Sequence, residues 1–388
     1  MRIMLENQKD KFNLEGDVRY INCAYMSPIL KKAEEAGIAG IRRKRRPYEI
    51  GPSDYFDDVI LARQKMARLI GAETDQVVMI PSVSYGFSML LQNMKGKRGQ
   101  KAIVITNEFP SGFLSLERWC REQEVDLEII EPVSEGIPKG KSWNERILEA
   151  IDERTACVLM SYVHWMDGTC FEVEEIGERC RQYGAYFLMD GTQGVGIRPI
   201  DVSKLKVDAI CCAAYKWLMG PYSSGFAYVG ERFSEGKPLE ETWMNRANAQ
   251  DFSGLTGYCS EYTPGATRYN VGQTSDFIKV PMLIEGLNQL LDWKTVEMDR
   301  YVEQLMEPLD RFLEEYGFGL EEKKYRSNHI RGIYLPETVD RELLLQSFEE
   351  ERIKLSFRGA SIRVSPNVYN TREDMEALIF CLQKSMNK

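Results

Sequence analysis

The feature that most constrains the fold is an alternation of short apolar runs with segments of helical hydrophobic spacing. The apolar runs have strand length, and each is followed by a segment whose apolar residues recur at three- and four-residue intervals. This alternation predicts an α/β fold with a mostly parallel sheet between helices. The runs are Val77–Ile80, Ala102–Thr106, Leu127–Ile130, Ala156–Tyr162 and Tyr186–Met189, and the helical segments are Tyr55–Ile70, Tyr85–Asn93, Gly112–Gln123, Trp143–Ile151 and Val173–Tyr183.

Two further apolar runs, Ala209–Ala213 and Gly225–Val229, lie too close together for a helical crossover between them. Antiparallel strands need only a short connection, whereas parallel strands need a crossover of a dozen or more residues. We therefore expect these two runs to pair antiparallel at the same sheet. With them, the sheet has seven strands.

The pattern changes after the last of these strands. Residues Pro238–Thr274 lose periodicity, and long irregular stretches of this kind in compact domains are usually functional. Two long amphipathic helices, Phe277–Leu291 and Lys294–Tyr316, are expected next, followed by a smaller α+β region with strands at Ile330–Leu335 and Ser361–Ser365 around a helix at Arg341–Glu350. We predict a large domain over residues 19–275 and a small domain over 276–388 together with residues 1–18.

Composition narrows the class of protein. The 388 residues are 43% apolar and carry a net charge of 50 − 59 = −9, so no broad cationic surface is available for nucleic acid or anionic lipid. The longest apolar runs, such as Ala209–Tyr215, are far shorter than a membrane-spanning helix. We expect a cytoplasmic protein that acts on a small molecule.

Cysteine and histidine content limits the chemistry. The nine cysteines include no C-x-x-C pair, and we expect reduced, mostly buried thiols. His164 and His329 are the only histidines, so a multi-histidine metal site is excluded and we assign no metal. His164 follows a predicted strand, but we favour a structural role for it.

Polar residues follow several predicted strands at the positions where ligands bind in α/β sheets, outside the carboxyl ends of the strands. We expect them to converge on one cleft. They are Ser82-Val83-Ser84, Glu108-Phe109-Pro110, Asp190-Gly191-Thr192-Gln193 and Tyr215-Lys216-Trp217.

Each of these residues has a structural interpretation beside the functional one. Lys216 is a solvated surface lysine or a functional amine, and its apolar surroundings favour the second. Asp190 and Ser84 are turn or N-cap residues, or else ligands of a cofactor. Phe109 is either an ordinary core aromatic or a stacking residue, and Gln193 is either a turn residue or a hydrogen-bond donor.

Longer segments carry a resemblance to a known family. The segment from Met189 to Val229, with its D-G-T-Q and Y-K-W-L-M-G-P motifs 26 residues apart (216 − 190), resembles the core of class V aminotransferases. The late Arg363-Val-Ser-Pro-Asn-Val-Tyr-Asn-Thr371, together with Asn22–Pro28 and Arg268–Gln273, extends the resemblance over nearly the whole chain. This resemblance implies a fold-type I enzyme that uses pyridoxal 5′-phosphate.

The same resemblance implies roles for the residues in the cleft. Lys216 would form a Schiff base with the cofactor aldehyde and carry the substrate Cα proton, and Asp190 would keep the pyridine nitrogen protonated. The phosphate would lie at the helix start of Val83 and Ser84, with Tyr215 as a further ligand and Gln273 reaching it from a neighbouring subunit. Phe109 would cover the ring, and Gln193 would bond the phenolic oxygen.

Arg363 is the candidate for binding the substrate α-carboxylate, since a guanidinium makes two parallel hydrogen bonds to a carboxylate. A surface salt bridge is the alternative, and for Arg352 and Arg358 we favour that simpler interpretation.

The family resemblance leaves the reaction open, because one fold and cofactor support several reactions. Desulfurases of the family place a nucleophilic cysteine shortly before the arginine motif, but Ile353–Ile362 contains none. The interpretation is therefore an aminotransferase for an amino-acid-like substrate, a homodimer by resemblance, with a pyridoxal phosphate-dependent lyase or epimerase as the alternative. An α/β binding protein without this cofactor is the alternative of another class.

Overall fold

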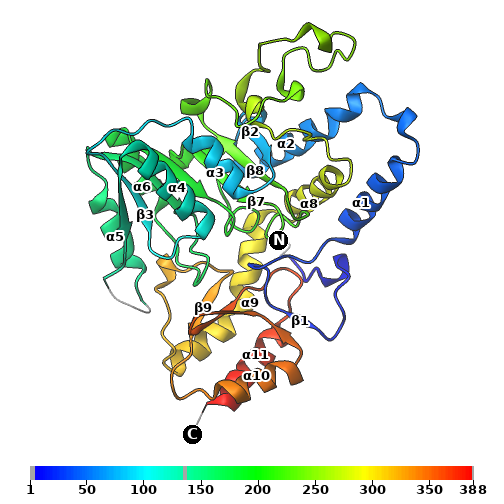
Figure 1. Ribbon diagram of the computed structural model, residues 1–388. Helices are drawn as coiled ribbons and strands as arrows, with labels where there is room; N and C mark the ends of the chain where they lie inside the picture. Colours follow the sequence, from blue (N-terminus) through cyan, green and yellow to red (C-terminus); the bar gives the residue numbers. More distant parts are fainter. Residues whose placement is uncertain (1–4, 134–137, 387–388) are drawn as a thin grey trace, which may run out of the picture.

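The computed structural model describes residues 5–133 and 138–386. Its centre is a seven-stranded sheet with the order β2-β8-β7-β6-β5-β3-β4 (Figure 1). The strands are β2 (Val77–Ile80), β3 (Lys101–Ile105), β4 (Asp126–Ile130), β5 (Thr155–Ser161), β6 (Tyr186–Asp190), β7 (Ala209–Ala213) and β8 (Gly225–Val229).

Strand directions follow the connection lengths. The strands β4, β3, β5, β6 and β7 run parallel, with helices between most of them, whereas β8 pairs antiparallel with both β7 and β2. The predicted seven-stranded, mostly parallel sheet and its antiparallel element are therefore confirmed. Since the parallel strands end at the same edge, the residues that follow β3, β5, β6 and β7 are brought together.

The helices that cover the sheet begin and end at recognisable signals. Ser82 caps α3 by accepting a hydrogen bond from the Tyr85 amide, and α6 ends at Gly184, whose φ of 70° is a left-handed conformation that favours glycine. The helices are α2 (Asp57–Ile70), α3 (Val83–Leu91), α4 (Pro110–Gln123), α5 (Gly140–Ala150), α6 (Val173–Tyr183) and the short α7 (Val202–Leu205).

Both faces of the sheet are buried. Along β5, Cys157 and Leu159 join the apolar core on one face, and Val158 and Met160 join the core on the other. This alternation follows from the two-residue repeat of side chains in a strand, and the continuous apolar character of β5 is typical of a strand covered on both sides. The sheet is thus a rigid support for the residues at its edge.

The C-terminal region gathers at one end of the molecule, drawn in orange and red in Figure 1. It holds a three-stranded sheet, β11-β12-β9, and a two-stranded parallel pair between β1 and β10. The elements of this region are β1 (Arg19–Tyr20), α9 (Thr295–Glu315), β9 (Arg331–Tyr334), α10 (Arg341–Glu350), β10 (Ile353–Lys354), β11 (Ser356–Arg358), β12 (Ser361–Val364) and α11 (Arg372–Ser385). Helices α1 (Lys31–Arg43) and α8 (Lys279–Trp293) lie elsewhere, where α8 packs against both α1 and α2 (Figure 1).

The region Pro238–Thr274 contains no α-helix or named strand, only the short 3-10 turns at Trp243–Asn245, Leu255–Gly257 and Gly265–Tyr269, as the loss of periodicity predicted. Over the described ranges, 5–133 and 138–386, no helix combines the length and apolar character that crossing a bilayer requires. The outer ends of the predicted small domain, residues 1–4 and 387–388, lie outside the described residues.

Candidate active site

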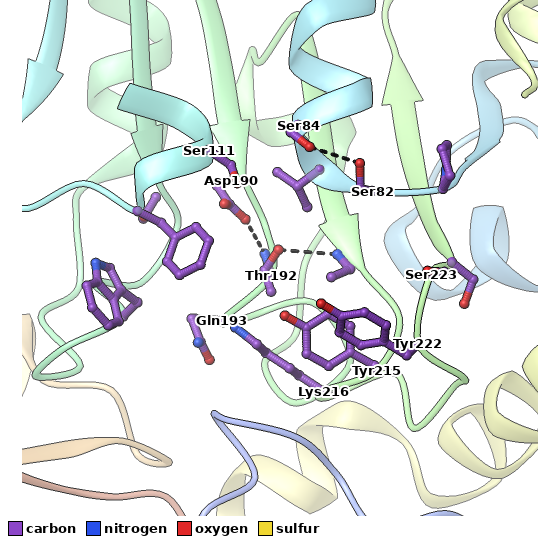
Figure 2. A pocket seen from close by; sticks show the side chains of 17 residues that line it. Ser82, Ser84, Ser111, Asp190, Thr192, Gln193, Tyr215, Lys216, Tyr222 and Ser223 are labelled. Carbon is purple, nitrogen blue, oxygen red and sulfur yellow. Dashed lines mark hydrogen bonds between the residues drawn. The ribbon is translucent and has the colours of Figure 1, made fainter. Parts of the chain in front are cut away.

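A cavity of about 320 Å³ opens at the carboxyl edge of the sheet. Its walls come from the segments that follow β2, β3, β5, β6 and β7 (Figure 2). Nine of the residues singled out from the sequence line it together: Ser82, Val83, Ser84, Phe109, Asp190, Thr192, Gln193, Tyr215 and Lys216.

Lys216 lies in the tight connection between β7 and β8, where the apolar strand β7 carries it into the interior. Its side chain is only 6% exposed, and its Nζ lies 5.4 Å from the centroid of the Phe109 ring. Burial lowers the pKa of the ammonium group to about 8, while the Asp190 carboxylate opposes this shift. A substantial fraction of the amine is therefore neutral near physiological pH, as a nucleophilic or proton-accepting amine requires.

Asp190 is the last residue of β6, and its side chain is 5% exposed. The Oδ1 atom accepts a hydrogen bond of 2.8 Å from the Thr192 amide, and the Thr192 hydroxyl in turn accepts one from the Ala213 amide. Burial raises the pKa of the carboxyl, and the Thr192 hydrogen bonds and the Lys216 charge counteract it. The arrangement aims a buried acid into the cavity and holds it in one orientation.

The start of α3 forms the opposite wall. Ser82 caps this helix, and its hydroxyl lies 2.9 Å from that of Ser84 (Figure 2). The first amides of a helix have no carbonyl partner within the helix, and the helix dipole adds positive potential there. Val83 and Ser84 therefore offer a position for an anionic group such as a phosphate.

Aromatic rings close the sides of the cavity. The Phe109 ring meets the Trp165 ring edge-on at 5.5 Å, and the Tyr215 ring lies 4.7 Å from the Tyr222 ring. Such walls fit a planar ring and exclude water from it.

Gln193 lines the cavity with a side-chain amide that already makes two hydrogen bonds within the protein. Its Oε1 accepts a hydrogen bond of 2.9 Å from the Trp217 indole, and its Nε2 donates to the Ala24 carbonyl at 3.1 Å. One N–H of the amide remains for a ligand. Behind it, the buried His329 contacts the Gln193 carbonyl at 2.6 Å, and burial lowers the pKa of His329 to about 3. His329 is therefore a neutral, structural residue.

Arg363 does not line the cavity itself but lies beside it on β12. Its side chain is 1% exposed, and its Nη1 donates a hydrogen bond of 2.8 Å to the carbonyl of Trp165, which is a lining residue. Among the described residues, its Nε and Nη2 atoms are buried with no hydrogen-bond partner. Burial, together with the charge of Arg358, lowers the pKa of this guanidinium to about 9. A buried cation with two open donors calls for an anionic ligand.

Gln273 is exposed and is not among the residues that line the cavity within one chain. His164 is also outside the cavity: it is buried, and its Nδ1 lies 2.9 Å from the Asp167 carboxylate, which pairs with Lys139. The structural interpretation of His164 fits this position.

Several lining residues were not identified from the sequence. Ser111 opens α4 after β3, and Ser224 precedes β8, so both stand next to strand ends that the periodicity located. Trp165 and Tyr222 lie on irregular connections, for which the sequence pattern carried no signal. Glu108 lies just behind the wall, where it accepts hydrogen bonds from the Ser161 and Phe109 amides at 2.6 and 2.7 Å.

The cysteines of the described residues are unpaired, and eight of the nine are buried. The positive charges of Lys216 and Arg363 favour the thiolate of Cys23, but the residue is fully buried and burial raises its pKa to about 12. A thiol of this kind is a poor nucleophile. No cysteine lies in β10, β11 or the start of β12, the segments before Arg363.

These residues fit a pyridoxal phosphate. The amides of Val83 and Ser84 at the start of α3 and the buried pair of Asp190 and Lys216 line one cavity with aromatic walls, and Arg363, with its two open nitrogens, lies beside it. Arg363 would hold a substrate carboxylate, the α3 amides the cofactor phosphate, and Asp190 and Lys216 the two ends of the cofactor's reactive ring system.

Comparison with known proteins agrees with this fit. The family described as Aminotransferase class-V matches residues 55–378. An uncharacterized aminotransferase, YcbU, of Bacillus subtilis is 25% identical over 346 residues, 84% of this chain and 87% of that protein. A probable cysteine desulfurase of Methanothermobacter thermautotrophicus is 27% identical over 229 residues, 59% of this chain and 55% of that protein.

Solved structures share the fold. The apo cysteine desulfurase of Thermococcus onnurineus superposes with a TM-score of 0.78 at 20% identity, covering 96% of this chain and 95% of that one. A variant of C-DES with glycine covalently linked to its PLP cofactor gives a TM-score of 0.85 at 18% identity, covering 98% of this chain and all of that one. The fold is therefore fold-type I, and the alternative of an α/β binding protein without the cofactor is set aside. The chain belongs to the class V aminotransferase family of pyridoxal phosphate-dependent enzymes.

Proposed function

We propose that the protein is an aminotransferase that moves an amino group between an amino-acid-like substrate and a keto acid. The observation that carries this proposal is the buried Arg363 guanidinium beside the Lys216 cavity. Its Nη1 is bonded to the Trp165 carbonyl, which leaves the edge formed by Nε and Nη2 free for a carboxylate. An α-carboxylate held on this edge by two parallel hydrogen bonds would place the neighbouring amino-bearing carbon toward Lys216.

Bound pyridoxal phosphate supplies a ring that stabilises negative charge on the substrate carbon next to the amino group. Lys216 takes the proton from this carbon and returns it, a task for which its lowered pKa of about 8 suits it. Asp190 would keep a proton on the pyridine nitrogen. The amides of Val83 and Ser84 would bind the phosphate, with the Tyr215 hydroxyl as a further donor. Phe109 would cover the ring, and Gln193 would donate its remaining N–H to the phenolic oxygen.

A pyridoxal phosphate-dependent lyase or epimerase is the second candidate, favoured by the relatives that are named as cysteine desulfurases. Persulfide chemistry needs a reactive thiol near the substrate. The segment before Arg363 has no cysteine, and Cys23 is buried with a raised pKa, so desulfurase activity is the least favoured of these reactions.

We also propose a cytoplasmic homodimer. Nine unpaired cysteines are typical of a reducing compartment. Gln273 is exposed at the end of the irregular segment Pro238–Thr274, from which it would reach the phosphate of a partner subunit. The division into a large domain, 19–275, and a small domain, 276–388 with residues 1–18, belongs to the same proposal.

The experiment is a substrate screen. Purified protein loaded with pyridoxal phosphate is mixed with each amino acid and with pyruvate, 2-oxoglutarate or glyoxylate, and the new amino acid and keto acid are measured. Transfer of the amino group to one of these acceptors supports the proposal. Formation of alanine from cysteine without an acceptor, or racemisation alone, would replace it with the lyase or epimerase reading.

A further inference from the structure

A second arginine shares the face of the hairpin that carries Arg363. In the antiparallel pair of β11 and β12, Ser356 lies opposite Arg363, and Arg358 lies opposite Ser361. Side chains two residues apart on a strand point to the same face, so Arg358 lies on the face of Ser356 and hence of Arg363. The two arginines are diagonal neighbours, within reach of each other's long side chains.

Arg358 was interpreted from the sequence as a solvated charge, and the structure shows it half-buried, with one end of its guanidinium exposed and the other end covered. Its Nε is buried with no hydrogen-bond partner among the described residues, and burial lowers the pKa of its guanidinium. Its Nη1 donates a hydrogen bond of 2.9 Å to the carbonyl of the neighbouring Phe357. Arg352, by contrast, is exposed and pairs with Glu15 at 2.8 Å and with Asp17, as expected for a solvated charge.

Within the described part of the chain, the hydrogen bonds of these two arginines go to backbone carbonyls, and neither has a carboxylate partner. Both lie close to the cavity: the Arg358 guanidinium is 5.6 Å from the centroid of the Trp165 ring, and the Trp165 carbonyl holds Arg363. The positive charges of Arg363 and Arg358 both lower the pKa of Lys216, so the three cationic side chains lie close enough to repel one another. Like charges on one hairpin face are unfavourable unless an anion lies between or beside them.

One α-carboxylate satisfies the open Nε–Nη2 edge of Arg363 and leaves Arg358 without an anion. We propose that Arg358 binds a second acidic group, so that the site takes an amino acid with two carboxylates, as amino donor or as the corresponding 2-keto dicarboxylic acceptor. This inference rests on the proposed function, since it takes Arg363 as the α-carboxylate ligand. Arg358 is then the residue that selects the substrate side chain.

The test measures binding rather than turnover. Dissociation constants of glutarate and of pentanoate, which have the same carbon chain but two and one carboxylates, are determined by isothermal titration calorimetry on the cofactor-loaded protein. A charge-assisted hydrogen bond is worth enough to change affinity by about tenfold to a hundredfold, so the wild-type protein binds glutarate tighter than pentanoate by about this factor.

Four variants locate the effect. Arg358→Gln is expected to remove the preference for glutarate and to leave the affinity for pentanoate within about threefold, and Arg358→Lys to restore part of the preference. Arg352→Gln, the matched control with the same change of charge on the same segment, keeps the wild-type preference. Arg363→Gln weakens both ligands alike.

The outcomes separate the two proposals. Equal binding of glutarate and pentanoate by the wild-type protein, or an unchanged preference in Arg358→Gln, overturns the role of Arg358 and leaves the aminotransferase proposal standing. Tight binding of both ligands by Arg363→Gln overturns the α-carboxylate assignment on which both depend. Circular dichroism and the cofactor absorbance of each variant show that the fold and the loaded site are intact.

Discussion

The carbonyl oxygen of Trp165 accepts a hydrogen bond of 2.8 Å from Nη1 of the buried Arg363. This bond joins a loop after β5 to the C-terminal hairpin, two segments separated by 198 residues in the sequence. It also fixes the guanidinium so that its Nε and Nη2 atoms stay open. The orientation of one side chain thus depends on the packing of the C-terminal region against the sheet edge.

Replacing Arg363 by Lys removes the bidentate geometry and keeps a positive charge. We expect KM for the amino acid substrate to rise by about tenfold to a hundredfold, the worth of one charge-assisted hydrogen bond, with the cofactor still bound. Steady-state kinetics and the cofactor absorbance measure the two effects. Arg352→Lys is the control, because Arg352 is exposed and pairs with Glu15 and Asp17. An unchanged KM in Arg363→Lys would mean that the α-carboxylate binds elsewhere.

The pKa of Lys216 predicts the pH dependence of cofactor loading. Only the neutral amine reacts with an aldehyde, and burial lowers the pKa of Lys216 to about 8. Below this value the rate of loading into cofactor-free protein should rise by about tenfold per pH unit, and above it the rate should level off. Stopped-flow absorbance after addition of pyridoxal phosphate measures this rate. A midpoint near the ordinary lysine pKa would contradict the assignment of a buried, neutral amine.

Glu108 predicts a second pH effect, this time on stability. Burial and the nearby Asp190 charge raise its pKa to about 7. A carboxyl whose pKa is higher in the folded than in the unfolded state stabilises the fold while it is protonated. This contribution is complete below the unfolded pKa, near 4.5, and is lost as the pH rises through about 7.

The matching variant is Glu108→Gln, which does not titrate. The two carboxylate oxygens of Glu108 accept the backbone N–H groups of Phe109 and Ser161, whereas a glutamine side chain has only one oxygen. One of these N–H groups then lacks an acceptor, so we expect the variant to be less stable by about 1–3 kcal/mol. Its free energy of unfolding, from urea titrations between pH 5 and 8, should depend less on pH than that of the wild-type protein. Parallel pH curves for the two proteins would show that Glu108 does not titrate in this range.

Gln193 predicts a cost in stability that is separate from cofactor binding. Its side-chain oxygen accepts the indole N–H of Trp217, a fully buried residue next to Lys216. Gln193→Leu keeps the approximate volume and leaves that N–H unpaired, which costs about 1–3 kcal/mol. Urea unfolding of the cofactor-free protein measures this loss. Trp217→Phe, which has no indole N–H, should make Gln193→Leu less costly when the two changes are combined, whereas an equal cost in both backgrounds would assign the loss to the hydrogen bond that Gln193 donates to the Ala24 carbonyl.

Much of the sheet could be predicted from the sequence because its strands are buried on both faces. A run such as Val77–Ile80 is apolar throughout, and β2 has these same bounds. The residues after such runs then identify the cavity, since parallel strands end at one edge. Lys216 and Asp190 were found in this way.

Elements that depend on tertiary contacts were not predicted. Helix α1 contains Gly37 and Gly40, which lower helix propensity, and a Cβ at Gly37 would meet the Met282 sulfur of α8 at 2.8 Å. These glycines serve the packing of α1 on α8 rather than the helix itself. Helix α11, by contrast, has a local signal that could have located it, the capping box of Thr371 and Asp374.

The side chains around the cavity also divide into those that the sequence could identify and those whose role depends on tertiary contacts. Arg358 could not be separated from Arg352 by sequence, because both are charged residues among short strands. Only the pairing of β11 with β12 places Arg358 on the face of Arg363, and only the path of the N-terminal segment supplies acids to Arg352. Whether a charged side chain is exposed, and which groups it pairs with, depends on how distant segments of the chain pack together.

The most direct measurement identifies the lysine that holds the cofactor. The protein loaded with pyridoxal phosphate is reduced with borohydride, digested, and sequenced by tandem mass spectrometry. The account predicts a pyridoxyl group on the peptide that contains Lys216, and no such group in Lys216→Ala, whereas the surface control Lys204→Ala is labelled as the wild-type protein is. Labelling of a different lysine, or equal labelling of Lys216→Ala, would contradict the site described above.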